Sequence, residues 1–180
     1  HIKGKQSHAI VEQGLQILRN LTHRGAVGAD PLAGDGAGIL IQMPDAFLRR
    51  EFSQQDIQLP KNGDYALGML FLPRAAQTRA VCEQILAAVV KEEGQTFIGW
   101  RDVPTNNTRL GKGVQAVEPV VRQLCIGRGT STPPKAFERK LFVIRKVVEH
   151  RVRALDLPDK GMFYVPSMSS RTLVYKGMLL

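Results

Sequence analysis

A glycine-rich stretch near the start of the chain constrains the fold more than any other feature. Residues 21–40 lie between a helical pattern and a strand pattern and contain five glycines, Gly25, Gly28, Gly34, Gly36 and Gly38. Glycine permits positive φ and close backbone approach, at an entropic cost that a plain connection need not carry. Such a segment suits a place where backbone N–H groups and a few side chains surround a small polar ligand. An irregular helix-to-strand connection is the alternative interpretation.

The spacing of these glycines does not fit the common nucleotide-binding loops. Gly34, Gly36 and Gly38 are spaced Gly-x-Gly-x-Gly and precede a strand pattern. A dinucleotide fingerprint reads Gly-x-Gly-x-x-Gly, follows a strand and opens a helix. Gly111-Lys112 does not form a phosphate-binding loop either, because Asn106 stands where the first glycine of that motif should be. A nucleotide site is therefore disfavoured.

Length, hydrophobicity and cysteine content favour one reduced globular domain. The chain has 180 residues, 43% of them hydrophobic, which is enough for one domain with a real core. We expect no membrane association, because no apolar run approaches the span of a bilayer and the start lacks a signal-peptide pattern. Cys82 and Cys125 form no Cys-x-x-Cys pair, so a reducing, cytoplasmic setting fits. Cys82 is expected on the core face of a helix and not as a nucleophile.

The net charge of +9 raises the question of nucleic-acid binding. Lys and Arg are scattered, however, and the densest run, residues 139–153, also contains Glu149. Aromatic residues are few and are not interleaved with the basic ones, as a stacking platform would require. The pattern predicts a solvated basic helix face and no nucleic-acid partner.

Hydrophobic periodicity predicts a mixed α+β fold, with sheets covered by helices. Gly14 inside the first helix predicts that something packs closely against it, Ser7 is its expected N-cap, and Trp100 is expected to anchor packing. The last two strands are expected to pair with each other around residues 166–171. We expect helices at 6–21, 44–52, 75–93 and 136–155, strands at 37–43, 65–72, 96–103, 120–126, 163–165 and 172–175, and loops at 104–118 and 127–134.

Titratable residues form no complete catalytic set by spacing alone. The four histidines, at positions 1, 8, 23 and 150, have no metal-ligand spacing. His23-Arg24-Gly25 is the only place where titratable residues meet a permissive backbone. Arg24 fits two roles equally well: it can hold a carboxylate through two hydrogen bonds, or fasten a neighbouring loop.

The same stretch carries a family resemblance. Gly14-Leu15 together with Leu21-Thr22-His23-Arg24-Gly25-Ala26 resembles the start of class II, N-terminal nucleophile glutamine amidotransferase domains, and residues 22–39 are similar to their glutamate synthase branch. The resemblance spans nearly the whole chain. Further matches lie at residues 42–44, 71–73, 99–104, 137–141 and 169–179.

This resemblance implies a fold, a reaction and partners. Residues 1–180 would be part of a single amidotransferase domain, an incomplete four-layer α/β/β/α sandwich of the N-terminal nucleophile hydrolase type. The domain would hydrolyse L-glutamine to glutamate and ammonia, and an internal tunnel would carry the ammonia to 2-oxoglutarate at a flavin site. The parent protein would contain FMN and an iron–sulfur cluster outside this chain. Its partners would be a flavin synthase domain of the same polypeptide and, as the resemblance allows, a small reductase subunit.

The chain also departs from the family pattern. The family's nucleophile is a cysteine that becomes the first residue after processing, and His1 aligns shortly after that position. The later motifs for the substrate arginine segment, the oxyanion hole and the substrate-binding aspartate are expected beyond Leu180. Only Arg24 and Gly25 map onto family active-site residues, as the turn that lines and orients the nucleophile pocket. We therefore expect this chain to be a fragment without glutaminase activity of its own.

Two other interpretations stay open from the residues. One is a different class II amidotransferase, such as an amidophosphoribosyltransferase or a glucosamine-phosphate synthase. Both have shorter segments after the Arg-Gly turn, so the length of this chain and residues 99–104 favour the glutamate synthase branch. The other is a non-catalytic module that keeps the fold without the nucleophile. A nucleic-acid binder ranks last.

Overall fold

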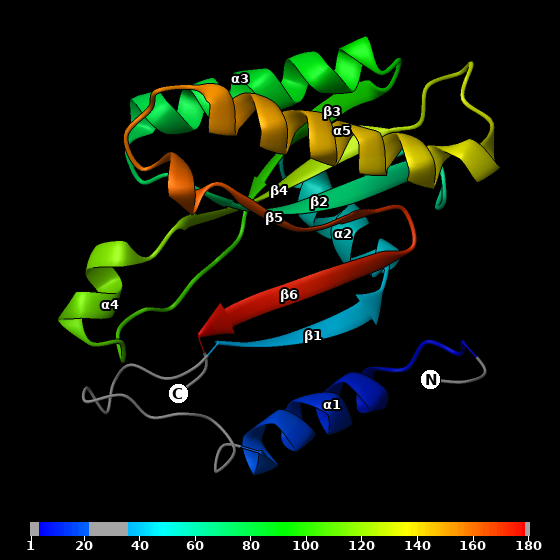
Figure 1. Cartoon of the computed structure of the whole chain (residues 1–180). Helices are drawn as coiled ribbons and strands as arrows, with labels where there is room; N and C mark the ends of the chain where they lie inside the picture. The colour runs from blue at the N-terminus through cyan, green and yellow to red at the C-terminus, as the bar shows by residue number, and fades with distance from the viewer. Residues whose placement is uncertain (1–3, 22–35, 179–180) are drawn as a thin grey trace.

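A computed structural model describes residues 4–21 and 36–178, whose helices and strands are arranged in layers (Figure 1). The helices are α1 (His8–Asn20), α2 (Asp45–Ser53), α3 (Ala76–Glu92), α4 (Lys112–Val117) and α5 (Pro134–Ala154), with a 3₁₀ turn at Lys160–Met162. The strands are β1 (Gly36–Gln42), β2 (Tyr65–Leu72), β3 (Thr96–Asp102), β4 (Val120–Gly127), β5 (Tyr164–Ser169) and β6 (Thr172–Met178). No helix among these residues has the length and apolar character needed to cross a membrane.

Two antiparallel sheets form the middle of the molecule. The larger has the strand order β3-β4-β2-β5, and the smaller is the pair β1-β6, in register from Gly36 opposite Met178 to Gln42 opposite Thr172. Helices α3 and α5 cover one face of the larger sheet, while α1 lies beside β1 (Figure 1). The described elements therefore follow the expected order of helix, sheet, sheet and helix, which agrees with the predicted α+β class.

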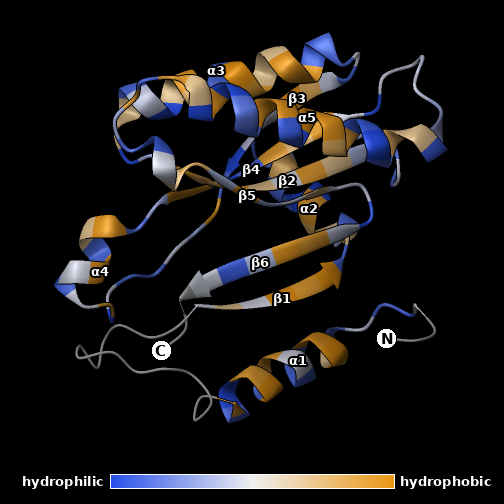
Figure 2. Ribbon diagram, viewed as in Figure 1, coloured by the Kyte–Doolittle hydropathy of each residue, from blue (hydrophilic) through white to orange (hydrophobic). Residues whose placement is uncertain are grey.

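The outer core lies between the larger sheet and the helices α3 and α5. On α5, buried apolar residues recur at helical spacing, as the sequence predicts, and Figure 2 shows this face turned toward the sheet. Cys82 on α3 is fully buried in the same core, which confirms its expected packing role. The α5 residues in this core are Phe137, Leu141, Ile144, Val148 and Val152.

The inter-sheet core lies on the opposite face of the larger sheet. Strand β2 is buried on both faces, because its alternate residues enter the two cores: Leu70 packs under α5, whereas Tyr65 and Met69 pack toward β6. This position explains why β2 reads as an unbroken apolar run in an antiparallel sheet. Leu48 and Phe52 from α2 fill the same core.

Gly14, Ser7 and Trp100 carry the expectations for local packing and helix capping. A Cβ on Gly14 would lie 3.1 Å from Cδ1 of Ile39 on β1, so the expected close packing at Gly14 is confirmed. Ser7 occupies the N-cap position with extended backbone, but its side chain makes no capping hydrogen bond. Trp100 is partly buried and packs against the outer core, as expected.

The predicted pairing of the last two strands is wrong. Strand β5 pairs with β2 in the larger sheet, and β6 pairs with β1 in the smaller one. The chain changes sheet at Ser170-Arg171, where the Glu138 carboxylate accepts hydrogen bonds from the Ser170 amide at 2.7 Å and the Ser169 hydroxyl at 3.1 Å. A hairpin between these strands is therefore replaced by a corner fixed to α5.

The segment expected as a loop at residues 104–118 contains the short helix α4. None of its six residues is buried, so the sequence has no apolar stripe from which this helix could be predicted. Hydrogen bonds hold it instead: Arg74 Nη1 donates to the carbonyl oxygens of Gln115 at 2.7 Å and Ala116 at 2.5 Å, near the end of the helix. A carbonyl-capping arginine thus fixes a helix that apolar burial does not.

Candidate functional site

The structure describes only part of the glycine stretch singled out from the sequence. Arg24, Gly25 and His23 lie outside the described residues, so the geometry of the predicted turn is not part of this structure. The end of the glycine stretch is described, and Gly36 and Gly38 begin strand β1. These two glycines belong to the described part of the glycine stretch, and they line the candidate site.

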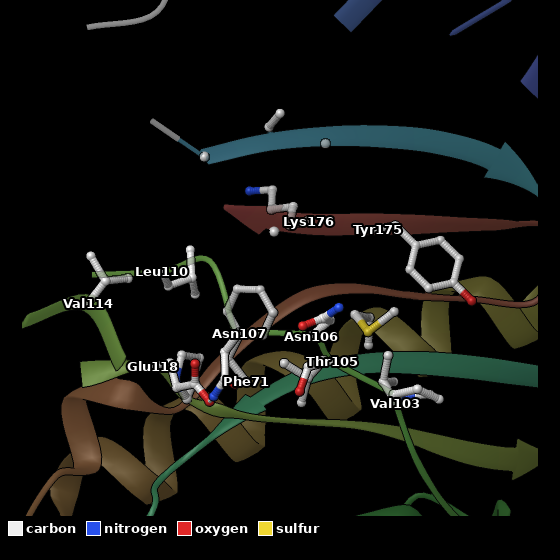
Figure 3. A pocket seen from close by; sticks show the side chains of 18 of the residues that line it. Phe71, Val103, Thr105, Asn106, Asn107, Leu110, Val114, Glu118, Tyr175 and Lys176 are labelled. Atoms are coloured by element: carbon white, nitrogen blue, oxygen red, sulfur yellow. The ribbon is translucent and has the colours of Figure 1, made fainter. Parts of the chain in front are cut away.

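A cavity of about 800 Å³ opens between the two sheets at the end where β1 starts (Figure 3). Its walls are mainly apolar and come from β1, β2, β6 and the segment around α4. A cavity of this size is in the range of small-molecule sites. Side chains on its walls include Met69, Phe71, Val103, Leu110, Val114, Tyr175 and Lys176.

Glycines leave the backbone uncovered along one wall of this cavity. A Cβ on Gly38 would lie 3.0 Å from the carbonyl oxygen of Tyr175, and one on Gly36 would lie 3.6 Å from that of Gly177. Any side chain at position 38 would therefore push the two strands apart, which explains part of the glycine pattern by close approach of β1 to β6.

The segment around α4 forms the opposite wall through its own hydrogen bonds. The Gln115 amide donates to the carbonyl oxygens of Asn107 at 3.0 Å and Leu110 at 2.8 Å. The Asn107 amide donates to Glu118 Oε1 at 3.0 Å. These bonds and Arg74 keep α4 in place while its apolar residue Val114 lines the cavity.

A buried polar network crosses the inter-sheet core next to the cavity. Arg101 on β3 donates to Glu51 Oε2 at 2.6 Å and to Gln123 Oε1 at 3.1 Å, and the Gln123 amide donates to the Tyr175 hydroxyl at 3.3 Å. The Arg101 hydrogen bond lowers the pKa of the Glu51 carboxyl, against a smaller opposing effect of desolvation. The Arg101 guanidinium also lies over the Phe47 ring, 5.3 Å from its centroid. The network joins α2, β3, β4 and β6 behind a cavity wall.

Sequence reasoning did not single out this network. Arg101 and Gln123 each interrupt a strand with a polar side chain, and both are buried in the structure. That interruption is the available signal, because a buried polar group in a strand needs a hydrogen-bonding partner. The partners come from residues far away in the chain, so spacing does not reveal them.

The surroundings of the two cysteines disfavour the reactive thiolate form. Both are fully buried, Cys82 in the outer core and Cys125 in the inter-sheet core. Burial raises the pKa of the Cys125 thiol to about 12 and also raises the pKa of the Cys82 thiol. Neither is a thiolate near neutral pH, and thiolate is the nucleophilic form.

Metal binding has no candidate within residues 4–21 and 36–178. No three His, Cys, Asp or Glu side chains in these ranges lie together as a metal-binding group. The two cysteines of the chain lie in different cores and do not fit an iron–sulfur cluster, which requires several cysteine ligands.

Comparison with known proteins supports the resemblance carried by the glycine stretch. The chain is 45% identical to the large chain of NADPH glutamate synthase from Bacillus subtilis, over 99% of this chain and 11% of the relative. It is 38% identical to NADH glutamate synthase from Schizosaccharomyces pombe, over 99% of this chain and 8% of the relative. It is 34% identical to ferredoxin-dependent glutamate synthase 2 from Synechocystis, over 99% of this chain and 11% of the relative.

The chain thus spans about a tenth of the length of these relatives. The family described as class-II glutamine amidotransferases matches residues 1–180, the entire chain. The resemblance predicted from residues 14–39 is confirmed, and it extends over both cores. The chain belongs to the class-II glutamine amidotransferases.

Proposed function

We propose that residues 1–180 are part of the single glutaminase domain of a glutamate synthase. The whole protein would hydrolyse L-glutamine to glutamate and ammonia and use the ammonia for reductive synthesis of glutamate from 2-oxoglutarate. One observation carries the proposal: relatives matched over 99% of this chain are named glutamate synthases, and their names include NADPH, NADH and ferredoxin forms. The proposal concerns the glutamine reaction that precedes those electron donors.

The proposed chemistry is that of an N-terminal cysteine amidotransferase. The thiol of a first-residue cysteine, outside this chain, attacks the amide carbon of glutamine, and its own α-amino group accepts the thiol proton and passes it to the departing ammonia. Water then hydrolyses the γ-glutamyl thioester to glutamate. The chain terminus thereby takes the part that a histidine plays in other activated nucleophiles.

Arg24 and Gly25 are the proposed contribution of this chain to the active site. In the family, the Arg-Gly turn lines and orients the nucleophile pocket, so Arg24 would position that pocket and Gly25 would let the backbone come close. Support comes from the end of the same stretch, where Gly36 and Gly38 border the inter-sheet cavity.

Residues 1–180 alone are proposed to be inactive as a glutaminase. Cys82 and Cys125 are internal, so neither carries a free α-amino group, and both thiols are buried with raised pKa values. Substrate therefore cannot reach either thiol, and neither thiol is ionised to the nucleophilic thiolate near neutral pH.

The remaining parts of the reaction are proposed to lie elsewhere in the parent protein. By the family resemblance, FMN and an iron–sulfur cluster would supply electron transfer there, and the described residues include no set of side chains that fits such a cluster. The flavin domain of the same polypeptide and a small reductase subunit are the proposed partners, and the cytoplasm is the proposed compartment.

Ammonia release from L-glutamine tests the proposal. The protein at its natural length is compared with a version carrying serine at the N-terminal cysteine, and with residues 1–180 alone. We expect turnover only in the first. Turnover in the serine version would overturn the mechanism, and a folded but inactive natural protein, assayed with 2-oxoglutarate and reductant, would favour the non-catalytic module.

Substitutions in the turn test the role given to Arg24. In the natural-length protein, Arg24→Ala should lower kcat/KM by about 100-fold, because small displacements of a positioned nucleophile are costly. Arg109→Ala removes an arginine from an exposed loop and serves as the matched control. Unchanged activity of the Arg24 variant would remove that residue from the site.

A further inference from the structure

Most of the excess positive charge of the chain is concentrated on one helix. Seven Lys and Arg residues and two Glu residues give α5 a net charge of +5, compared with +9 for the whole chain. Helix α5 lies on the outside of the molecule beside α3 (Figure 1). The helix therefore dominates the electrostatic potential of this face.

One side of α5 is neutralised by its neighbours. Arg151 pairs with Glu92 at the end of α3 at 2.7 Å, and Lys140 pairs with Glu93, the residue that follows α3, at 2.9 Å. Within α5, Arg145 pairs with the buried Glu149 at 2.9 Å. The expected solvated basic helix face is thus partly an ion-paired seam between two helices.

The outward side of α5 has a different composition. Lys135, Arg139 and Arg153 are exposed, and no ion pair is found for them among the described residues. They recur with Lys146 at helical spacing, so they form one line along the helix. Phe142 lies in the middle of this line, 60% exposed, and the Lys146 ammonium lies 5.9 Å from the centroid of its ring. We call Lys135, Arg139, Phe142, Lys146 and Arg153 the basic stripe.

We propose that the basic stripe is an interdomain interface, docked against an acidic surface of the parent protein outside residues 1–180. An exposed aromatic residue flanked by arginine and lysine has the composition of an interface centre with a charged rim. Lys146 pairs with Glu149 at 3.1 Å, whereas Lys135, Arg139 and Arg153 have no ion pair among the described residues. Three of the four cations of the stripe therefore have no counter-charge in this part of the protein. The relative from Bacillus subtilis is about nine times as long as the segment that it matches, so a parent protein of that length would offer a large further surface in the same polypeptide.

A protein surface fits these features better than a nucleic acid does. Phe142 is followed by Val143, which is 38% exposed, so the centre of the face is aliphatic as well as aromatic. Nucleic-acid platforms need several aromatic rings among the cations for base stacking. The basic stripe contains one ring. This proposal rests on the proposed function in one respect: the parent protein must be longer than residues 1–180.

Lysine accessibility in the intact, natural-length protein tests the proposal. Acetylation by an amine-reactive reagent is followed by mass spectrometry at Lys135 and Lys146, with the exposed Lys61 and Lys112 as reference sites in the same molecule. We expect the two stripe lysines to react about tenfold more slowly than the reference sites, because interface contacts exclude water and reagent. A carbodiimide should also join them to Asp or Glu side chains outside residues 1–180.

Charge reversal supplies the matched comparison. Arg139→Glu should restore the acetylation of Lys135 and Lys146 to the reference rate, whereas Arg109→Glu, an equal charge change in an exposed loop, should not. Equal labelling of all four lysines in the unsubstituted protein would overturn the proposal. The proposal would also be overturned if Lys135 and Lys146 were protected from acetylation only when RNA is added and lost that protection in Arg139→Glu. Neither readout involves glutamine, so a failed glutaminase proposal would leave this result unaffected.

Discussion

The two cores share one sheet but are closed to different degrees. The outer core under α3 and α5 is lined by apolar residues and is sealed by two long helices. The inter-sheet core is crossed by the Arg101 network and opens into a cavity of about 800 Å³. We propose that the outer core mainly contributes stability, whereas the inter-sheet core leaves room for a ligand beside it.

Leucine truncation on the two sides should separate these roles most widely. Leu141→Ala removes a fully buried side chain from the outer core and should lower the free energy of unfolding by about 2–5 kcal/mol. Leu110→Ala removes the same atoms from the cavity wall, where no closed void is created, and should cost less than about 1 kcal/mol. Urea denaturation of both variants measures the difference, and equal losses would contradict the comparison.

The polar network gives the next largest effect. Arg101→Ala should lower the free energy of unfolding by about 2–4 kcal/mol, because it removes the only hydrogen bond found among the described residues for the buried Gln123 Oε1 and the closer of the two arginines that contact Glu51. Arg50→Ala is the matched control, since Arg50 is exposed and contacts the same Glu51 at 3.7 Å. Its loss should be under about 1 kcal/mol. If the two arginines prove equivalent in urea denaturation, the network does not hold the sheets together.

The corner between the sheets should respond more weakly. Glu138→Gln removes the charge that accepts hydrogen bonds from Ser169 and Ser170, and should cost about 1–2 kcal/mol. Faster hydrogen exchange at the Ser170 amide would locate the effect. A double-mutant cycle with Ser170→Ala measures the coupling, and zero coupling would mean that the corner is held by packing alone.

The smallest of these effects on the free energy of unfolding should be the loss at low pH of the stability that Asp45 contributes at the edge of the inter-sheet core. The hydrogen bond from Arg49, at 2.9 Å, lowers the pKa of the Asp45 carboxyl, and the Tyr65 hydroxyl also donates to it at 2.8 Å. A lowered pKa contributes stability that is complete above the unfolded pKa of about 3.9 and is lost as pH falls through the folded pKa. The free energy of unfolding of Asp45→Asn should therefore fall less steeply below about pH 4. Its total loss on acidification should be about 1 kcal/mol smaller than that of the unsubstituted chain.

The tyrosine variant sharpens that pH experiment. Tyr65→Phe removes one of the two donors to Asp45, so its slope below pH 4 should lie between those of the unsubstituted chain and Asp45→Asn. Urea denaturation at a series of pH values measures all three. An unchanged slope in Asp45→Asn would show that other carboxylates dominate acid unfolding.

Local patterns in the sequence predict the outer core well. The stripe on α5 and the apolar run of β2 depend on neighbours within one element, and both are found where expected. The pairing of β6 with β1 joins residues such as Thr172 and Gln42, 130 positions apart, and no local pattern encodes that choice.

The candidate site is less predictable for the same reason. Arg101 receives its partners Glu51 and Gln123 from other elements, so its role emerges only when the chain is folded. Glycine is the exception, because Gly14 and Gly38 carry a local signal of close approach that the contacts bear out. The Arg24-Gly25 turn lies outside the described residues, and its role stays a prediction.

Trapping the acyl intermediate tests the central claim most directly. The natural-length protein is mixed with L-glutamine and quenched with acid, and peptide mass spectrometry locates any γ-glutamyl thioester. The account predicts one adduct, on the first-residue cysteine outside this chain, and none on Cys82 or Cys125, whose thiols are buried. A γ-glutamyl adduct on either internal cysteine would contradict it.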